Sequence, residues 1–271
     1  MAVPGAGGTA WDVQGAEDAP RVVLIHGLGM DRRVTWDAML PTFAARFRVA
    51  RYDLLGHGES ALPGAPVDLA ALARQVLALM DTLGWDRAAL VGFSLGGMIN
   101  RRVALDAPGR VNALAILNSP HDRGAAAQAE VEARARASAA GGPGARIDET
   151  LARWFTADFR ARHADRVETV RQVVLANDPE NYAAHRYVLA QGVRELIRPA
   201  PPITQPTLVM TCEGDTGSTP AMAHAIGAEI AGAAVEVVPG LQHLGLIERP
   251  DAFAWPVAAF LNAALAQERT Q

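Results

Sequence analysis

Ser94 has the surroundings that a serine nucleophile requires. It lies within Gly92-Phe93-Ser94-Leu95-Gly96-Gly97, a G-x-S-x-G pattern that follows an apolar, strand-like run and opens a helical one. In this pattern the serine sits on a sharp strand-to-helix turn that small flanking residues allow to close, so the hydroxyl projects above the sheet. A glycine-rich turn without a catalytic role is the alternative interpretation.

Serine is a poor nucleophile without a positioned base and an acid that orients the base. Among the seven histidines, His243 is the favoured base, because it follows the last predicted strand and precedes the final helix. Asp215 is the favoured acid; it lies on the loop CEGDTGSTP, residues 212–220, where glycines permit a tight turn. Glu213 and Asp122 are rival acids, and Asp215 also fits an ordinary turn or helix-initiating aspartate.

The other histidines favour structural roles. His26 ends the first core strand and His57 lies in Gly56-His57-Gly58 on the loop after the second, so we expect both to shape their loops. The remaining four lie in or near predicted helices without a recognisable motif: His121, His163, His185 and His224.

Backbone N–H groups are expected to hold the developing oxyanion. The first donor is the backbone N–H of Leu95, the residue after the nucleophile. The second is the backbone N–H of Leu28, which lies in His26-Gly27-Leu28-Gly29 on the loop after the first core strand. A dinucleotide-binding loop is the other interpretation of these glycines. It lacks its third glycine, because position 32 is Arg32, and no ribose-binding acid is evident.

The surrounding elements alternate between short apolar runs and longer helical patterns, which indicates a parallel sheet covered on both faces. The predicted core strands are 21–26, 48–53, 88–93, 111–118, 207–211 and 233–238, with an antiparallel edge strand at 9–13. The predicted helices are 36–47, 67–83, 94–106, 220–231 and 252–266.

The alternation stops between residues 119 and 202, where we find no convincing strand. This segment holds helix formers, a flexible Gly141–Gly144 and a proline run at Pro199–Pro202. We expect residues 1–118 and 203–271 to form the α/β core and residues 119–202 to form a helical lid over the carboxyl edge of the sheet. Ligands bind at that edge in open α/β sheets.

Composition excludes several functions. The 271 residues contain 25 basic side chains and every one is arginine, so a lysine Schiff base or a P-loop is impossible. The formal charge of −4, with interspersed signs, argues against nucleic acid. Cys212 is the single cysteine, which favours a reducing compartment. With neither a secretory leader nor a membrane-length apolar run, we expect a cytoplasmic protein of undetermined oligomeric state.

The chain resembles the α/β-hydrolase superfamily over nearly its whole length. The resemblance is carried by HGLGMDRRVTW, RYDLLGHGES, VGFSLGGM, the Gly-Asp loop and LQHLGLIERP, and by the chain order serine, aspartate, histidine. It is most similar to the 3-oxoadipate enol-lactonase group, including LARWFTADFR at 151–160 and NDPENYAAH at 177–185. The resemblance implies Ser94 as nucleophile, Asp215 as acid, His243 as base, Leu28 and Leu95 as oxyanion donors, and no metal or organic cofactor.

The expected function is therefore hydrolysis of a small carboxylic ester or lactone through an acyl-enzyme. Carbon–carbon bond hydrolysis, thioester hydrolysis or perhydrolysis by the same residues are alternatives, as is a ligand receptor that keeps the fold. Phe93 and Leu95, at the variable positions of the G-x-S-x-G pattern, and the longer acid loop depart from the enol-lactonase pattern. These departures leave the identity of the substrate undetermined. Expected pocket residues are Met30, Trp154 and Phe155, and candidate cations for a carboxylate are Arg32, Arg33, Arg153 and Arg186.

Overall fold

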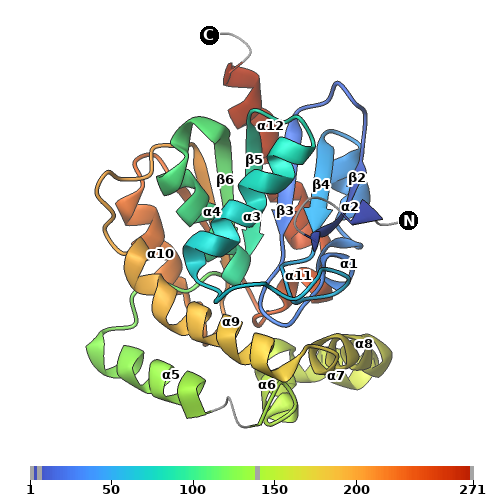
Figure 1. Ribbon diagram of the computed structural model, residues 1–271, viewed down its shortest axis with the longest axis vertical. Coiled ribbons are helices and arrows are strands. Elements are labelled where there is room, and N and C mark those ends of the chain that lie inside the picture. Colours follow the sequence, from blue (N-terminus) through green and yellow to red (C-terminus); the bar gives the residue numbers. More distant parts are fainter. Residues whose placement is uncertain (1–2, 5–7, 138–140, 269–271) are drawn as a thin grey trace.

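The computed structural model describes residues 3–4, 8–137 and 141–268, whose strands form one sheet. The strand order is β1-β2-β4-β3-β5-β6-β7-β8 (Figure 1). From β3 onwards the strands are parallel, while β2 runs antiparallel to β4 and to β1. The bounds are β1 Val3–Pro4, β2 Ala10–Gln14, β3 Arg21–Ile25, β4 Arg48–Tyr52, β5 Ala88–Phe93, β6 Val111–Leu117, β7 Thr207–Cys212 and β8 Ala234–Val238.

The six predicted core strands are confirmed, each with ends within one residue of the expected position. Continuous apolar runs account for them, because β5 and β7 are buried along their whole length while β8, at the sheet edge, is mostly exposed. The predicted edge strand is present as β2. It is not outermost, since Val3 pairs with Trp11 and adds the two-residue β1.

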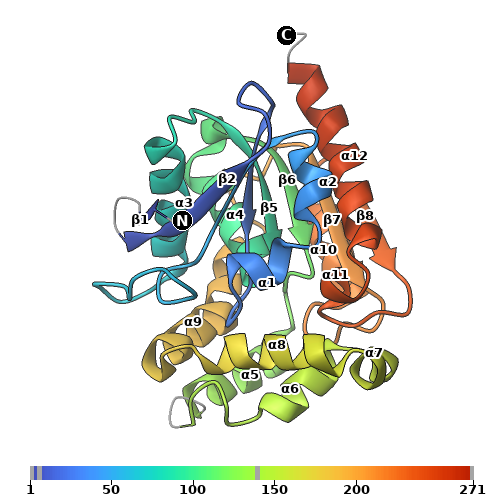
Figure 2. The same ribbon diagram turned by 90° about the vertical axis from the view of Figure 1, so that its right-hand side faces the viewer.

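Helices cover both faces of the sheet, as expected. Figures 1 and 2 show α3 and α4 on one face and α2 and α12 on the other. The bounds are α1 Arg32–Trp36, α2 Leu40–Ala44, α3 Leu69–Thr82, α4 Leu95–Asp106, α10 Pro220–Glu229, α11 Gly245–Glu248 and α12 Asp251–Glu268, with short 3₁₀ helices at Pro108–Arg110 and Gly192–Leu196.

The predicted single helix over residues 36–47 is wrong. The structure has two short helices there, α1 ending at Trp36 and α2 beginning at Leu40. Pro41 lies in the first turn of α2 and has no N–H to donate to a preceding carbonyl, so it favours a helix start over a helix interior.

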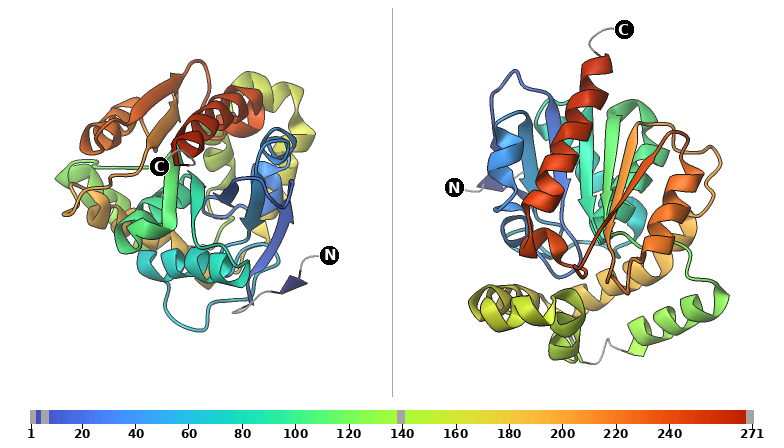
Figure 3. Two further views of the ribbon diagram at one scale, coloured as in Figure 1. Left: turned by 90° about the horizontal axis from the view of Figure 1, so that it is seen from above. Right: turned by 180° about the vertical axis from the view of Figure 1, so that it is seen from behind.

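The described residues between β6 and β7 contain five α-helices. They form a layer beyond the carboxyl ends of the strands, as Figures 2 and 3 show. We call them the inserted helices: α5 Ala125–Ala137, α6 Ile147–Trp154, α7 Ala157–Arg162, α8 Ala164–Leu175 and α9 Pro179–Gln191. The described part of segment 119–202 contains no strand, as predicted. Its role as a lid stays a prediction at this point. None of the helices in the described ranges is long and apolar enough to span a bilayer.

Candidate active site

Ser94 occupies a strained turn between β5 and α4. Its backbone has φ 54° and ψ −111°, a conformation rare for a residue with a side chain. The backbone N–H of Ser94 donates to the Leu117 carbonyl of neighbouring β6 at 2.8 Å. Strain of this kind persists only where surrounding structure enforces it, and it is concentrated at functional sites. Ser94 thus has the elbow geometry that its sequence motif predicts.

Close backbone packing explains why glycines surround Ser94. A Cβ built on Gly92 would lie 2.1 Å from the Gly96 carbonyl oxygen, and one on Gly96 would lie 2.1 Å from the Ile25 carbonyl oxygen of β3. A Cβ on Gly97 would lie 2.6 Å from the Ser119 Cβ. Because the clashes at Gly92 and Gly96 would be with backbone atoms, no side-chain movement can relieve them. The glycines allow α4 to start directly against β3 and β5.

Asp215 and His243 meet at the same edge of the sheet. His243 Nδ1 lies 2.7 Å from Asp215 Oδ2, which also accepts a hydrogen bond from Asn118 Nδ2 at 2.9 Å. The other oxygen, Oδ1, accepts from the backbone N–H groups of Gly217 and Ser218, each at 2.9 Å. Asp215 is only 2% exposed. Every lone-pair direction of its buried carboxylate is thereby directed to a donor.

The electrostatics favour an ionised Asp215. Burial acts to raise its pKa, but the charge of His243 and the hydrogen bonds from His243, Asn118 and Ser218 outweigh burial and lower the pKa. An ionised carboxylate at Nδ1 leaves Nε2 as the ring nitrogen that is free to accept a proton. The pair therefore has the electrostatic arrangement required of a base and its orienting acid.

The sequence did not single out Asn118, which follows β6. Its backbone has φ 45° and its amide holds Asp215. Asparagine tolerates this left-handed conformation better than most residues, so an Asn directly after a buried strand was the available signal.

A cavity of about 390 Å³ lies between the sheet edge and the inserted helices. Ser94, Asp215 and His243 all line it, together with the predicted residues Leu28, Met30 and Trp154. The His243 ring lies near two aromatic rings, with centroids 5.1 Å from Phe93 and 6.0 Å from Trp154. The lining of this cavity thus brings the nucleophile, base and acid candidates together.

Two predicted residues lie outside the cavity lining. Phe155 is fully buried and stacks on Phe159 at 5.2 Å, because its side chain turns into the interior of the inserted helices. Leu95 is also fully buried at the start of α4, so only its backbone could face a ligand.

The rival acids lie elsewhere. Asp122 is exposed and accepts from the Gly124 N–H at 2.8 Å, closing a local turn. Glu213 accepts from the Gly240 N–H at 3.0 Å. Asp122 binds a backbone group of its own turn, and Glu213 joins the loop after β7 to the loop after β8, whereas Asp215 contacts His243.

His26 and His57 are loop residues, as expected. His26 Nε2 accepts from the Leu54 N–H at 2.9 Å, which ties the loop after β3 to the loop after β4. The His57 ring packs edge-on against His185 of α9, with centroids 4.6 Å apart. Burial lowers the pKa of His57 well below its ordinary value and lowers that of His185 to about 4.

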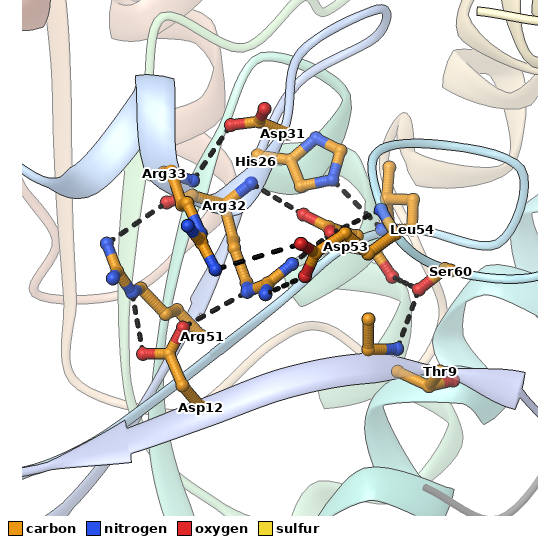
Figure 4. A network of polar contacts seen from close by, with 12 residues as sticks. Thr9, Asp12, His26, Asp31, Arg32, Arg33, Arg51, Asp53, Leu54 and Ser60 are labelled. Atoms are coloured by element: carbon orange, nitrogen blue, oxygen red, sulfur yellow. Dashed lines mark hydrogen bonds and ion pairs between the residues drawn. The ribbon is translucent and has the colours of Figure 1, made fainter. Parts of the chain in front are cut away.

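Arg32 is not a pocket cation. Figure 4 shows its guanidinium beside Asp12 and Asp53. Arg32 pairs with Asp53, with Asp12 at 3.0 Å and with Glu59 at 2.5 Å. Its side chain is 1% exposed, and the Arg32 N–H also donates to Asp53 at 2.7 Å. Arg32 thus pairs with the fully buried Asp53 carboxylate and with the partly exposed Asp12 and the exposed Glu59. Arg33 is 57% exposed beside Glu59 and is not part of the cavity lining either.

The other two candidate cations, Arg153 and Arg186, do line the cavity. Within the described residues neither forms an ion pair with a carboxylate. Burial raises the pKa of Tyr182, also in the lining, and the charges of Arg186 and Arg153 oppose that rise. Tyr182 and both arginines therefore line the same cavity. The remaining arginines of the lining are Arg123, Arg134 and Arg146.

Comparison with known proteins places this geometry in context. The family model described as "alpha/beta hydrolase fold" matches residues 20–250. A curated relative, 3-oxoadipate enol-lactonase 2 of Acinetobacter baylyi, is 28% identical over 250 residues, covering 92% of this chain and 91% of the relative.

Two solved structures extend the comparison. The enol-lactonase from Burkholderia xenovorans LB400 superposes with a TM-score of 0.85 at 31% identity, covering 97% of this chain and 100% of its own. A thermophilic esterase from Thermogutta terrifontis, solved with malate bound, has a TM-score of 0.83 at 26% identity and covers 94% of this chain and 93% of its own.

Proposed function

This chain belongs to the α/β-hydrolase fold family, and on that premise we propose that it cleaves a small carboxylic ester or lactone through an acyl-enzyme on Ser94. The observation that carries the proposal is the 2.7 Å contact between His243 and Asp215 at the cavity that Ser94 also lines. An ordinary turn serine or helix-initiating aspartate requires no such convergence of three separate loops.

In the proposed reaction, His243 Nε2 removes the proton of Ser94 Oγ as that oxygen attacks the substrate carbonyl carbon. Asp215 holds the imidazole orientation and stabilises the imidazolium that forms. The backbone N–H groups of Leu28 and Leu95 stabilise the oxyanion. Collapse of this intermediate breaks the ester bond, and His243 returns its proton to the leaving oxygen. Water then attacks the acyl-enzyme in the same way and releases the acid and free Ser94.

The inserted helices would act as the lid in this mechanism. Their residues Trp154, Tyr182, Leu189 and others complete a cavity whose floor is the catalytic edge of the sheet. Excluding bulk water strengthens every electrostatic interaction with the developing oxyanion. Met30 and Trp154 would supply the apolar contacts to the substrate.

The cavity's charges favour a substrate that carries a carboxylate. Arg153 and Arg186 line it without a carboxylate partner among the described residues, and a guanidinium binds carboxylate by two parallel hydrogen bonds. A lactone related to 3-oxoadipate enol-lactone has the required ester and carboxylate. The names of the two enol-lactonase relatives and the malate in the esterase structure agree with such a ligand. No metal or organic cofactor enters this mechanism, and a cytoplasmic location stays a prediction from the sequence.

The test is a hydrolysis screen of the purified protein with 3-oxoadipate enol-lactone, neutral p-nitrophenyl esters, a thioester and a vinylogous diketone that reports carbon–carbon cleavage. We expect lactone turnover, labelling by a fluorophosphonate probe, and loss of both in Ser94→Ala. Turnover of neutral esters alone would refute the substrate while keeping the mechanism. A folded protein that neither turns over any ester nor reacts with the probe would favour the receptor alternative.

A further inference from the structure

The loop that carries His243 is fastened to the inserted helices on both sides of the histidine. The Leu244 N–H donates to the Trp154 carbonyl at 2.9 Å, directly after the histidine. On the other side, the amide nitrogen of Gln242, in the orientation that satisfies both ends of the amide, donates to the Ala152 and Phe155 carbonyls. The last turn of α6 thus holds the chain immediately before and after the base.

A side-chain contact extends this attachment. Glu248, which ends α11, accepts from the Thr156 N–H through Oε1 and from the Thr156 hydroxyl through Oε2, each at 2.7 Å. The Thr156 hydroxyl oxygen in turn accepts from the Phe159 N–H at 3.2 Å and caps α7. Hydrogen bonds to an ionised acceptor are stronger than neutral ones, particularly when half-buried as here. Both oxygens of Glu248 are committed to one residue of the inserted helices.

The same short segment touches the base itself. The Trp154 ring lies 6.0 Å from the His243 ring, two residues before Thr156. Asp215 restrains the imidazole through Nδ1, and the Gly240 N–H and the Leu241 carbonyl join the earlier part of the loop to the acid loop. The attachment to α6 and α7 adds a restraint on the chain that follows the histidine, from the side of the inserted helices.

We propose that Thr156 and Glu248 form a clamp through which the inserted helices position His243 over Ser94. Both are positioning residues, since they act through the loop 242–248 and line no part of the cavity. The inference rests on the proposed function and deepens it: the α6–α7 junction is a fixed part of the catalytic machinery. The helices of the lid are then needed for proton transfer as well as for enclosing the substrate.

The test measures how fast a fluorophosphonate probe labels Ser94, because this rate reports activation of the nucleophile without substrate specificity. The variants are Thr156→Val, which removes the hydroxyl at constant shape, Glu248→Gln, their double variant, and Thr156→Ser, which restores a hydroxyl. Asp148→Asn is the matched control; it changes a carboxylate of α6 that pairs with Arg171 at 2.5 Å on the outer surface.

We expect Thr156→Val and Glu248→Gln each to lower the labelling rate and the kcat for p-nitrophenyl acetate about 10-fold, since small displacements of a catalytic group are costly. KM should stay within about two-fold, and the loss in the double variant should be less than multiplicative, because both substitutions affect the contact between the Thr156 hydroxyl and Glu248 Oε2. Thr156→Ser should recover most of the rate, and Asp148→Asn should match the wild type.

Labelling rates of Thr156→Val and Glu248→Gln that equal the wild-type rate would overturn the clamp, as would fully multiplicative losses in the double variant. Melting temperatures identify a variant that merely unfolds; Glu248→Gln, which preserves shape, decides the question if Thr156→Val does not fold. A wild-type protein that is not labelled would instead overturn the proposed function and, with it, any catalytic role of the clamp.

Discussion

His243 Nδ1 and Asp215 Oδ2 lie 2.7 Å apart although 28 residues separate them in the chain. The contact joins the loop after β7 to the loop after β8, two strands that are adjacent and parallel. Parallel neighbours end at the same edge of a sheet, so residues from successive loops converge there. Asn118, from the loop after β6, completes the arrangement by donating to the same carboxylate oxygen.

The first prediction concerns the acid. Asp215→Asn should lower kcat on the order of 10⁴-fold, because an amide nitrogen in place of Oδ2 cannot accept from Nδ1 and the imidazole adopts the wrong tautomer. The remaining oxygen still accepts from Gly217 and Ser218, so the fold should persist. Steady-state kinetics on p-nitrophenyl acetate, with circular dichroism as a folding check, measures this.

The rival acids provide the controls for that prediction. Asp122→Asn and Glu213→Gln should keep wild-type kinetics, because their carboxylates accept from the Gly124 and Gly240 N–H groups and do not contact His243. A large loss of kcat in Asp122→Asn, together with an active Asp215→Asn, would reassign the acid.

The second prediction tests the packing of the nucleophile turn. Gly96→Ala should destabilise the protein by about 3 kcal/mol or more, since its Cβ would meet the Ile25 carbonyl oxygen at 2.1 Å and neither backbone can yield easily. Gly64→Ala is the matched control, as a Cβ there meets nothing within 4 Å. Urea unfolding of both variants measures the difference. Equal stabilities would show that α4 can shift away from β3.

The core of the fold was predictable because its strands are buried on both faces. A strand such as β5, buried at every residue, needs an uninterrupted apolar run that is visible in the sequence. The positions of Ser94 and Asp215 were predictable for a related reason, since each follows such a strand; His243 follows β8, which is mostly exposed but still has a recognisable apolar run. The two-residue β1 carries no such pattern, because a single short pairing with Trp11 demands little of its sequence.

Side-chain partners were not predictable in the same way. Nothing in the sequence distinguishes Arg32, which pairs with buried Asp53, from Arg153, which lines the cavity. Phe155 and Trp154 are neighbours in one apolar segment, yet only Trp154 reaches the cavity, because α6 ends between them and turns Phe155 inward. Such outcomes depend on helix orientation, which is fixed by contacts between distant segments.

The third prediction separates these arginines by function. Arg153→Gln and Arg186→Gln should each raise KM for a carboxylate-bearing lactone about 10-fold, the effect of losing one charge-assisted hydrogen bond, with little change for neutral esters. Arg160→Gln, an exposed change outside the cavity lining, is the control. Equal KM changes for charged and neutral substrates would contradict carboxylate binding.

The fourth prediction is the opposite behaviour of Arg32. Arg32→Met should lower the free energy of unfolding by about 3–5 kcal/mol, because it leaves the fully buried Asp53 carboxylate without its ion pair. The KM for a carboxylate substrate should stay near the wild-type value in whatever fraction remains folded. Urea unfolding and kinetics on the same samples test both statements, and a raised KM at unchanged stability would return Arg32 to the pocket.

The fifth prediction follows from His185, which joins α9 to the core by packing against His57. Burial lowers its pKa to about 4 in the folded protein, whereas the unfolded chain has the ordinary value of about 6.5. Between these values the unfolded state binds a proton that the folded state excludes, so stability falls as the pH falls from about 6.5 to about 4. The full loss from this group is about 3 kcal/mol.

Urea unfolding at several pH values between 4 and 7 measures this slope, and His185→Gln should flatten it because glutamine does not titrate in this range. The stability of His185→Gln should still fall with falling pH, but less steeply than that of the wild type, because burial also lowers the pKa of His57. His224→Gln, which changes an exposed histidine of α10, serves as the control and should follow the wild-type curve. If the stability of His185→Gln also followed the wild-type curve, protonation of His185 would not be coupled to the docking of α9.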